Sequence, residues 1–122
     1  MSIWSDKIRE IREKYGSEYL LRQLAEESAE LAQAALKLIR AKRKETPVTV
    51  QEARADLVEE LADVSNMFDA VFRVLLEPGE QDAVREISTM KQLRMYDRLM
   101  NGGGDDGQTE TGLEILGGED LP

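Results

Sequence analysis

Three short turn-forming stretches divide the first hundred residues into four segments and leave the chain few folds to adopt. The breaks are Tyr15-Gly16-Ser17, Glu45-Thr46-Pro47-Val48-Thr49 and Glu77-Pro78-Gly79, where Gly and Pro interrupt a helical pattern. No segment shows sustained alternation of apolar and polar residues, so we expect no β-sheet. The sequence therefore predicts an all-α protein.

We expect helices over residues 6–15, 17–44, 50–76 and 80–100. Ser5 is the expected N-cap of the first helix, and Thr49 and Glu52 form an expected capping box before the third. The two middle segments are long and joined by a short connection, which predicts an antiparallel helical hairpin. Since a long amphipathic hairpin leaves a second face exposed, we expect the protein to self-associate.

The chain is expected to form one domain over residues 1–100, followed by an acidic, Gly-rich tail over residues 101–122. The tail has six acidic residues and no basic one. Its apolar residues are too few to offset the entropy of ordering it, so we expect the tail to be disordered.

The absence of two residue types excludes several kinds of chemistry. The chain has no Cys and no His, which rules out disulfides, Cys or His zinc sites, thiol nucleophiles and Ser-His-Asp triads. It has 25 acidic residues against 16 basic ones. Carboxylates favour hard cations such as Mg2+ or Mn2+.

Charge and hydropathy also limit the partners that we expect. The N-terminus lacks the layout of a signal peptide, and no apolar run is long enough to cross a membrane, so we expect a cytoplasmic protein without a membrane partner. The net charge is −9, and the first 100 residues hold all 16 basic residues against 19 acidic ones. No basic stripe covers a whole face, so we expect no polymeric nucleic acid partner.

An internal echo places acidic pairs on both long helices. Leu24-Ala25-Glu26-Glu27-Ser28-Ala29-Glu30-Leu31 matches Leu57-Val58-Glu59-Glu60-Leu61-Ala62-Asp63-Val64 at an offset of 33 residues. At about 100° per residue, Glu27 falls in the apolar stripe of its helix and Glu60 in the stripe of the next, with Glu30 and Asp63 one step aside. The pairs therefore point toward the partner helix.

Four carboxylates between two helices repel one another, and removing them from water costs several kcal/mol each unless they are paired, protonated or metal-bound. A divalent cation satisfies several acids at once. We therefore predict a Mg2+ or Mn2+ site made by Glu27, Glu30, Glu60 and Asp63. Glu26 and Glu59, farther round their helices, can equally be solvated acids, and Asp56 is interpreted as a boundary residue.

A carboxylate-held Mg2+ commonly binds phosphate oxygens, and phosphates also need cations. Lys91, Arg94 and Arg98 recur on one face of the last segment, and we predict that Lys91 and Arg94 contact phosphates; Arg98 can equally belong to a solvated basic face. Asn66 is a predicted ligand contact one turn after Asp63.

The aromatic residues have several interpretations. Trp4, Tyr15 and Tyr19 could stack on a base or pack in the core. Phe68 and Phe72 lie on the apolar arc of the third helix and are predicted to be core residues.

The chain resembles the MazG-like branch of the all-α nucleoside triphosphate pyrophosphohydrolases over about residues 3–99. The resemblance lies in Glu27-Ser28-Ala29-Glu30 followed by Glu60-Leu61-Ala62-Asp63, in the doubled Glu26-Glu27, and in the basic stretch of residues 91–98. The 29 residues between the motifs are at the long edge of the family's usual gap, and the base-reading residues have no clear match.

The resemblance implies Mg2+-dependent hydrolysis of an NTP or dNTP to the monophosphate and pyrophosphate, in a role that cleans the nucleotide pool. It makes Glu26 and Glu27 alternatives for the base that takes the proton of the attacking water. It also implies a homodimer or homotetramer in which two hairpins complete a four-helix bundle, in agreement with the self-association expected above. Two other functions remain open: a non-catalytic helical bundle with a partner-binding or regulatory role, and a phosphohydrolase of another helical type acting on ppGpp, against which the missing His counts.

Overall fold

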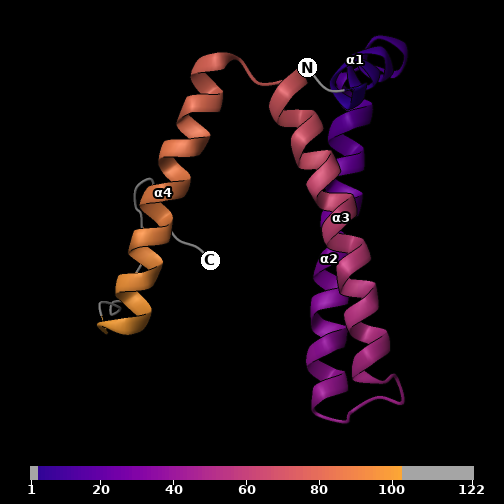
Figure 1. The fold of residues 1–122 in the computed structure, drawn as a ribbon, viewed down its shortest axis with the longest axis vertical. Coiled ribbons are helices and arrows are strands. Elements are labelled where there is room, and N and C mark those ends of the chain that lie inside the picture. Colours follow the sequence, from indigo (N-terminus) through magenta and orange to yellow (C-terminus); the bar gives the residue numbers. More distant parts are fainter. Residues whose placement is uncertain (1–2, 103–122) are drawn as a thin grey trace. The chain divides into compact units, whose positions relative to one another are not determined.

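The computed structural model describes residues 3–102 and contains four helices and no strand among them (Figure 1). The helices are α1 (Ile3–Tyr15), α2 (Ser17–Lys42), α3 (Val50–Val74) and α4 (Pro78–Met100). This confirms the all-α prediction. The chain divides into two compact units, Met1–Glu77 and Pro78–Pro122, which are described separately. The predicted disorder of the tail concerns residues that, apart from 101 and 102, lie outside the described range.

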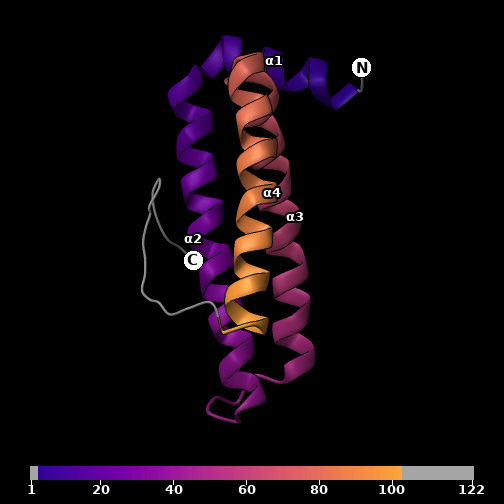
Figure 2. The same ribbon diagram turned by 90° about the vertical axis from the view of Figure 1, so that its left-hand side faces the viewer.

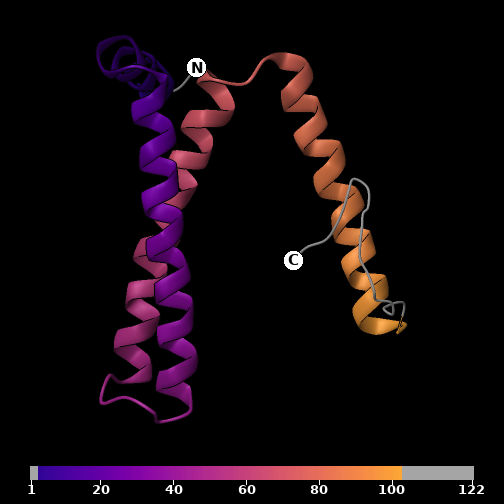
Figure 3. The ribbon, with the colours of Figure 1, turned by 180° about the vertical axis from the view of Figure 1, so that it is seen from behind.

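Helices α2 and α3 form the predicted antiparallel hairpin and run side by side along their length (Figures 1 and 3). Small residues fill much of the space between them, because Ala34 and Ala41 of α2 and Ala53 and Ala70 of α3 are all buried. Alanine lets two helix backbones approach closely and favours the helix itself.

A left-handed residue ends α2. Lys44 has a φ of 60°, and its backbone N–H donates to the carbonyl of Ala41 at 3.1 Å while the N–H of Glu45 donates to that of Arg40 at 3.0 Å. This is the Schellman arrangement, in which a C′ residue, usually Gly, turns the chain and satisfies the last carbonyls. Lys44 therefore holds a backbone conformation that a non-glycine side chain disfavours.

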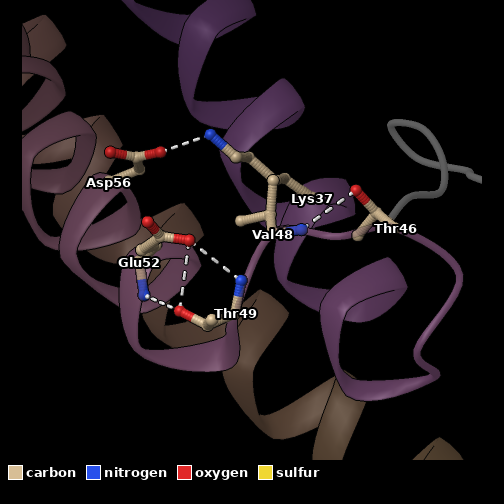
Figure 4. A network of polar contacts seen from close by, with 6 residues as sticks. All are labelled: Lys37, Thr46, Val48, Thr49, Glu52 and Asp56. Atoms are coloured by element: carbon tan, nitrogen blue, oxygen red, sulfur yellow. Dashed lines mark hydrogen bonds and ion pairs between the residues drawn. The ribbon is translucent and has the colours of Figure 1, made fainter.

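The predicted capping box begins α3 (Figure 4). The Thr49 hydroxyl accepts from the backbone N–H of Glu52 at 3.1 Å, and the Glu52 carboxylate accepts from the N–H of Thr49 at 3.0 Å. Two helix-end donors are thereby satisfied. Nearby, the Lys37 ammonium of α2 donates to the Asp56 carboxylate of α3, and this ion pair helps to set the register of the hairpin.

Helix α1 crosses the open end of the hairpin (Figure 2). Its Ile8 is buried with Leu20, Ala70 and Val74, and Trp4 and Ile11 pack around that cluster. The Arg12 guanidinium donates to the carbonyl of Val74 near the C-terminal end of α3. Gly16, with a φ of 90°, makes the corner between α1 and α2 in a conformation that suits glycine.

Several sequence predictions need correction. Ser5 is not an N-cap, because α1 already begins at Ile3 and Ser5 is buried within it. Helix α4 begins at Pro78, two residues before the predicted start, as the fixed φ of proline permits in a first turn. Phe68 is 52% exposed and is not a core residue, whereas Phe72 is half-buried with its ring 5.7 Å from that of Phe68.

The remaining unit consists, in its described part, of α4 and the two residues after it. No residue of α4 is buried, and it carries exposed apolar side chains on more than one side. None of the four described helices is apolar over a stretch long enough to cross a membrane.

Candidate metal centre

Two glutamates occupy core positions of the α2–α3 hairpin. The inward-facing residues of each helix recur every seven positions. On α2 they are Leu20, Glu27, Ala34 and Ala41, and on α3 they are Ala53, Glu60, Met67 and Val74. All but Glu27, Glu60 and Met67 are buried, and these three are half-buried. Such a spacing builds the seam of a coiled coil, where apolar residues are the stable choice. Glu27 and Glu60 are its two acidic interruptions.

Carboxylates from both helices converge at this point. One oxygen each of Glu27, Glu30 and Glu60 lie within 4.8 Å of one another. Glu30 is exposed and gives the group an opening to solvent, while Glu27 and Glu60 are half-buried. The cluster thus combines buried and accessible oxygens.

Two carboxylate oxygens of the cluster have no hydrogen-bond donor in the described part of the chain. The Oε1 atoms of Glu27 and Glu60 are both buried and without a hydrogen-bond partner among residues 3–102. A buried acceptor left unsatisfied costs free energy, more so when it is charged. The hairpin itself therefore does not supply the positive groups that these oxygens require.

The pKa values of both glutamates lie above the ordinary value. Burial is the largest cause for the pKa of Glu27, followed by the negative charges of Glu30, Asp63 and Glu60. Burial also leads for the pKa of Glu60, followed by the charges of Glu30 and Asp63. Each carboxylate resists ionisation because it is partly withdrawn from water and faces like charges.

The spacing of the three oxygens fits a single divalent cation. Oxygens on one divalent ion, at about 2.0 to 2.6 Å from it, lie at most about 4.0 to 5.2 Å apart, and the three oxygens of the cluster lie within 4.8 Å of one another. An all-carboxylate set is the donor type that Mg2+ and Mn2+ accept. A cation there would also supply the partner that the two buried oxygens lack.

The structure places the other predicted residues of the hairpin around this cluster. Asp63 is exposed and does not join the group of three, although its charge raises the pKa values of both half-buried glutamates. Glu26 is exposed and accepts a hydrogen bond from the Gln23 amide at 3.5 Å. Asn66 is exposed on α3. The roles of these three residues stay predictions.

Lys91 and Arg94 lie on α4, which belongs to the other unit. Both side chains are exposed, and neither takes part in any of the ion pairs found in the described part of the chain. Their role as phosphate contacts stays a prediction.

Sequence reasoning missed two features of the hairpin that carries the site. Lys37 and Asp56 form an ion pair between α2 and α3, which a pattern on either helix alone does not reveal. The buried Ala34, seven residues after Glu27, marks a close approach of the helices. The signal in the sequence was the seven-residue spacing of Ala34 and Ala41, two small residues that follow Glu27 on the same face of α2.

Comparison with known proteins does not add to this geometry, since no protein-family model matches the chain and no curated protein or solved structure matches it either.

Proposed function

We propose that this protein is a Mg2+- or Mn2+-dependent nucleoside triphosphate pyrophosphohydrolase of the MazG-like type, which converts an NTP or dNTP to its monophosphate and pyrophosphate. One observation carries the proposal: the half-buried pair Glu27 and Glu60, each with a buried oxygen that no donor of residues 3–102 satisfies, converges with Glu30 within 4.8 Å. The resemblance of the two acidic motifs to those of that family supplies the reaction.

The acidic residues would divide the work by their exposure. Glu27, Glu30 and Glu60 would hold the cation, and Asp63 would join them by a change of side-chain rotamer. Such a cation polarises a phosphate oxygen and lowers the pKa of a bound water. Glu26 or Glu27 would take the proton of the attacking water, and a carboxylate that must accept a proton near neutral pH benefits from a raised pKa.

The phosphates of the substrate need positive groups, which the acidic cluster lacks. In this proposal Lys91 and Arg94 neutralise charge that develops on the departing pyrophosphate. Asn66 would hydrogen-bond the nucleotide or a water. The cellular role would be cleaning of the nucleotide pool in the cytoplasm.

Homo-oligomerisation is part of the proposal. A second apolar stripe runs along the hairpin, formed by Leu21, Ala25, Ala32 and Ile39 of α2 and by Leu61, Phe68 and Phe72 of α3. All but Phe72 are exposed. Pairing this stripe with that of a second copy would bury it and complete a four-helix bundle.

The decisive experiment measures pyrophosphate release. The common ribo- and deoxyribonucleoside triphosphates are incubated with the protein and Mg2+, and pyrophosphate is scored separately from phosphate. Glu30→Gln is expected to abolish release while the circular dichroism of the helices is unchanged, because Glu30 is exposed and supports no core contact. Glu18→Gln, an exposed α2 acid paired with Arg22, is the matched control and should keep full activity.

Two outcomes would count against the proposal. Equal rates of pyrophosphate release by the wild type and Glu30→Gln would show that the cluster takes no part in the hydrolysis. No heat of binding in calorimetry with Mg2+ and a non-hydrolysable triphosphate would favour the non-catalytic helical bundle with a regulatory or partner-binding role.

A further inference from the structure

One face of α4 combines positive charge with exposed apolar surface. Lys91, Arg94 and Arg98 recur at i, i+3 and i+7, and Ile87 lies one turn before Lys91, so the four share one face of the helix. All four are exposed. We call this surface, made of Ile87, Lys91, Arg94 and Arg98, the basic face of α4.

The three basic residues of this face take no part in the ion pairs of the described chain. Among residues 3–102, Lys91, Arg94 and Arg98 form no ion pair. Asp97, three residues after Arg94, instead accepts a hydrogen bond from the Asn101 side chain at 3.0 Å. Arg85 lies on another side of the helix and is already paired with Asp82 at 3.0 Å.

The chain itself contains a segment of complementary chemistry. Beyond the described residues the sequence has six acidic residues and no basic one, and residues 110–116 place Leu113, Ile115 and Leu116 between and beside Glu110 and Glu114. We propose that residues 110–116 dock on the basic face of α4 of the same chain. Their carboxylates pair with Arg94 and Arg98, and their apolar side chains cover Ile87.

The distance along the chain permits this return. Helix α4 ends at Met100, and Gly102 has a φ of 66°, a left-handed conformation that redirects a chain after a helix. Ile87 lies about 20 Å back along α4 from Met100, at about 1.5 Å per residue. The ten residues from 101 to 110 span up to about 33 Å, which is ample for the tail to run back along the helix.

Tethering makes a weak contact sufficient. A segment joined to its site by a short linker has an effective concentration in the millimolar range, so a few exposed ion pairs and a small apolar contact hold it. A docked tail would present carboxylates where the proposed function places the phosphates of a nucleotide, and it would compete with them. Only this competition rests on the proposed function, and the docking does not.

The experiment uses the full-length chain, which has no Cys, so that Thr111→Cys gives one labelling position. A nitroxide on this cysteine broadens the amide resonances of nearby residues. We expect broadening at residues 87–98 in about 0.01 M salt, where the screening length is ~30 Å, and its loss in about 1 M salt, where the length is ~3 Å.

Matched variants separate the basic face from the rest of α4. In the labelled chain, Arg94→Gln combined with Arg98→Gln should remove the broadening, whereas Arg85→Gln should leave it unchanged. Arg98→Glu should weaken it, and adding Glu114→Lys should restore it. The restoration excludes a simple loss of helical structure as the explanation.

Three results would overturn the docking. The first is no broadening on α4 in low salt. The second is an equal response to Arg85→Gln and to the double substitution. The third is broadening in a mixture of isotope-labelled chains without nitroxide and unlabelled chains with it, which would place the tail of a second copy on the face. Since no nucleotide is present, none of these results depends on whether the protein hydrolyses triphosphates.

Discussion

At the residue scale, Glu60 is a carboxylate at a core position of the hairpin, where its negative charge lowers the stability of the fold. It stands seven residues after the buried Ala53, no described residue donates a hydrogen bond to its Oε1 atom, and its pKa is raised by burial and by neighbouring acids. An uncompensated acid at such a position destabilises a helical pair when it is charged. The cation site that we propose would supply the compensating charge.

Glu60→Gln should raise the melting temperature of the metal-free protein at pH 7, because it removes a negative charge that is partly withdrawn from water and repelled by neighbouring acids. We also expect Mg2+ to raise the melting temperature of the wild type, since a ligand that binds only the folded state stabilises it, and Glu60→Gln should abolish this rise. Thermal unfolding followed by circular dichroism with and without Mg2+ measures both effects. Glu18→Gln is the control, and a Mg2+ response retained by Glu60→Gln would contradict this prediction.

The stability of the metal-free protein should fall as the pH rises through the raised pKa values of Glu27 and Glu60. The folded state binds protons more tightly than the unfolded state at these sites, so their contribution is fully present below the unfolded pKa and is lost above the folded one. Urea unfolding across this pH range measures the slope. Glu27→Gln combined with Glu60→Gln should reduce the slope of unfolding free energy against pH. An unchanged slope would show that other titrating groups cause the pH dependence.

Helical periodicity alone predicted which acids face the partner helix. It placed Glu27 and Glu60 in the apolar stripes, where the structure has them half-buried. It also directed Asp63 toward the partner helix and into the predicted metal site. In the structure Asp63 is exposed and outside the group of three, because side-chain rotamers, which periodicity does not predict, decide how far an acid reaches inward.

At the element scale, the two ends of the hairpin loop follow different rules. The capping box of Thr49 and Glu52 was readable from the sequence and is present. The sequence predicts that α2 ends at residue 44, but α2 ends at Lys42. Lys44 adopts a left-handed conformation, which cannot be predicted from a lysine. Boundaries formed by a specific side-chain bond are easier to predict than boundaries formed by the backbone.

Lys44→Gly should stabilise the protein by about 1 kcal/mol, because glycine adopts the left-handed conformation without a steric penalty. Lys42→Gly, two residues earlier and within α2, should destabilise it by about 1 kcal/mol through the low helix propensity of glycine. Urea unfolding gives both values. Destabilisation by both substitutions would show that Lys44 contributes something beyond its backbone conformation.

Thr49→Ala should cost about 1 kcal/mol, because it removes the hydroxyl that accepts from the backbone N–H of Glu52. Thr46→Ala, in the same loop, is the comparison, since its hydroxyl accepts only a longer bond of 3.4 Å from the N–H of Val48. Equal losses of unfolding free energy in the two variants would deny the capping box its role.

At the scale of the whole molecule, four helices and their order followed from Gly and Pro placement, whereas tertiary burial did not. Phe68 was expected in the core but is 52% exposed, because a helix with two apolar stripes does not reveal which stripe its own chain covers. Sequence periodicity identifies apolar faces; contacts with other elements or other copies decide which are buried.

Phe68→Glu should reduce the oligomer that we propose to a single chain, because it puts a charge in the centre of the second apolar stripe. Size-exclusion chromatography with light scattering measures the mass. Ala55→Glu, an exposed position on another side of α3, is the control and should leave the mass unchanged. A wild type that is already a single chain of 13.8 kDa would contradict the stripe as an interface.

The position of the turn in the α2–α3 hairpin affects the rates at which the hairpin closes and opens. Residues nearest the turn, such as Ala41 and Ala53, are close in sequence, so we expect their contacts to form first when a chain closes from its loop, and the acids to meet one another later. Interactions made after the folding barrier act mainly on the rate of opening. A cation held by Glu27 and Glu60 would therefore slow the opening of the hairpin and lengthen the lifetime of its closed state, while the rate of closing would stay almost unchanged.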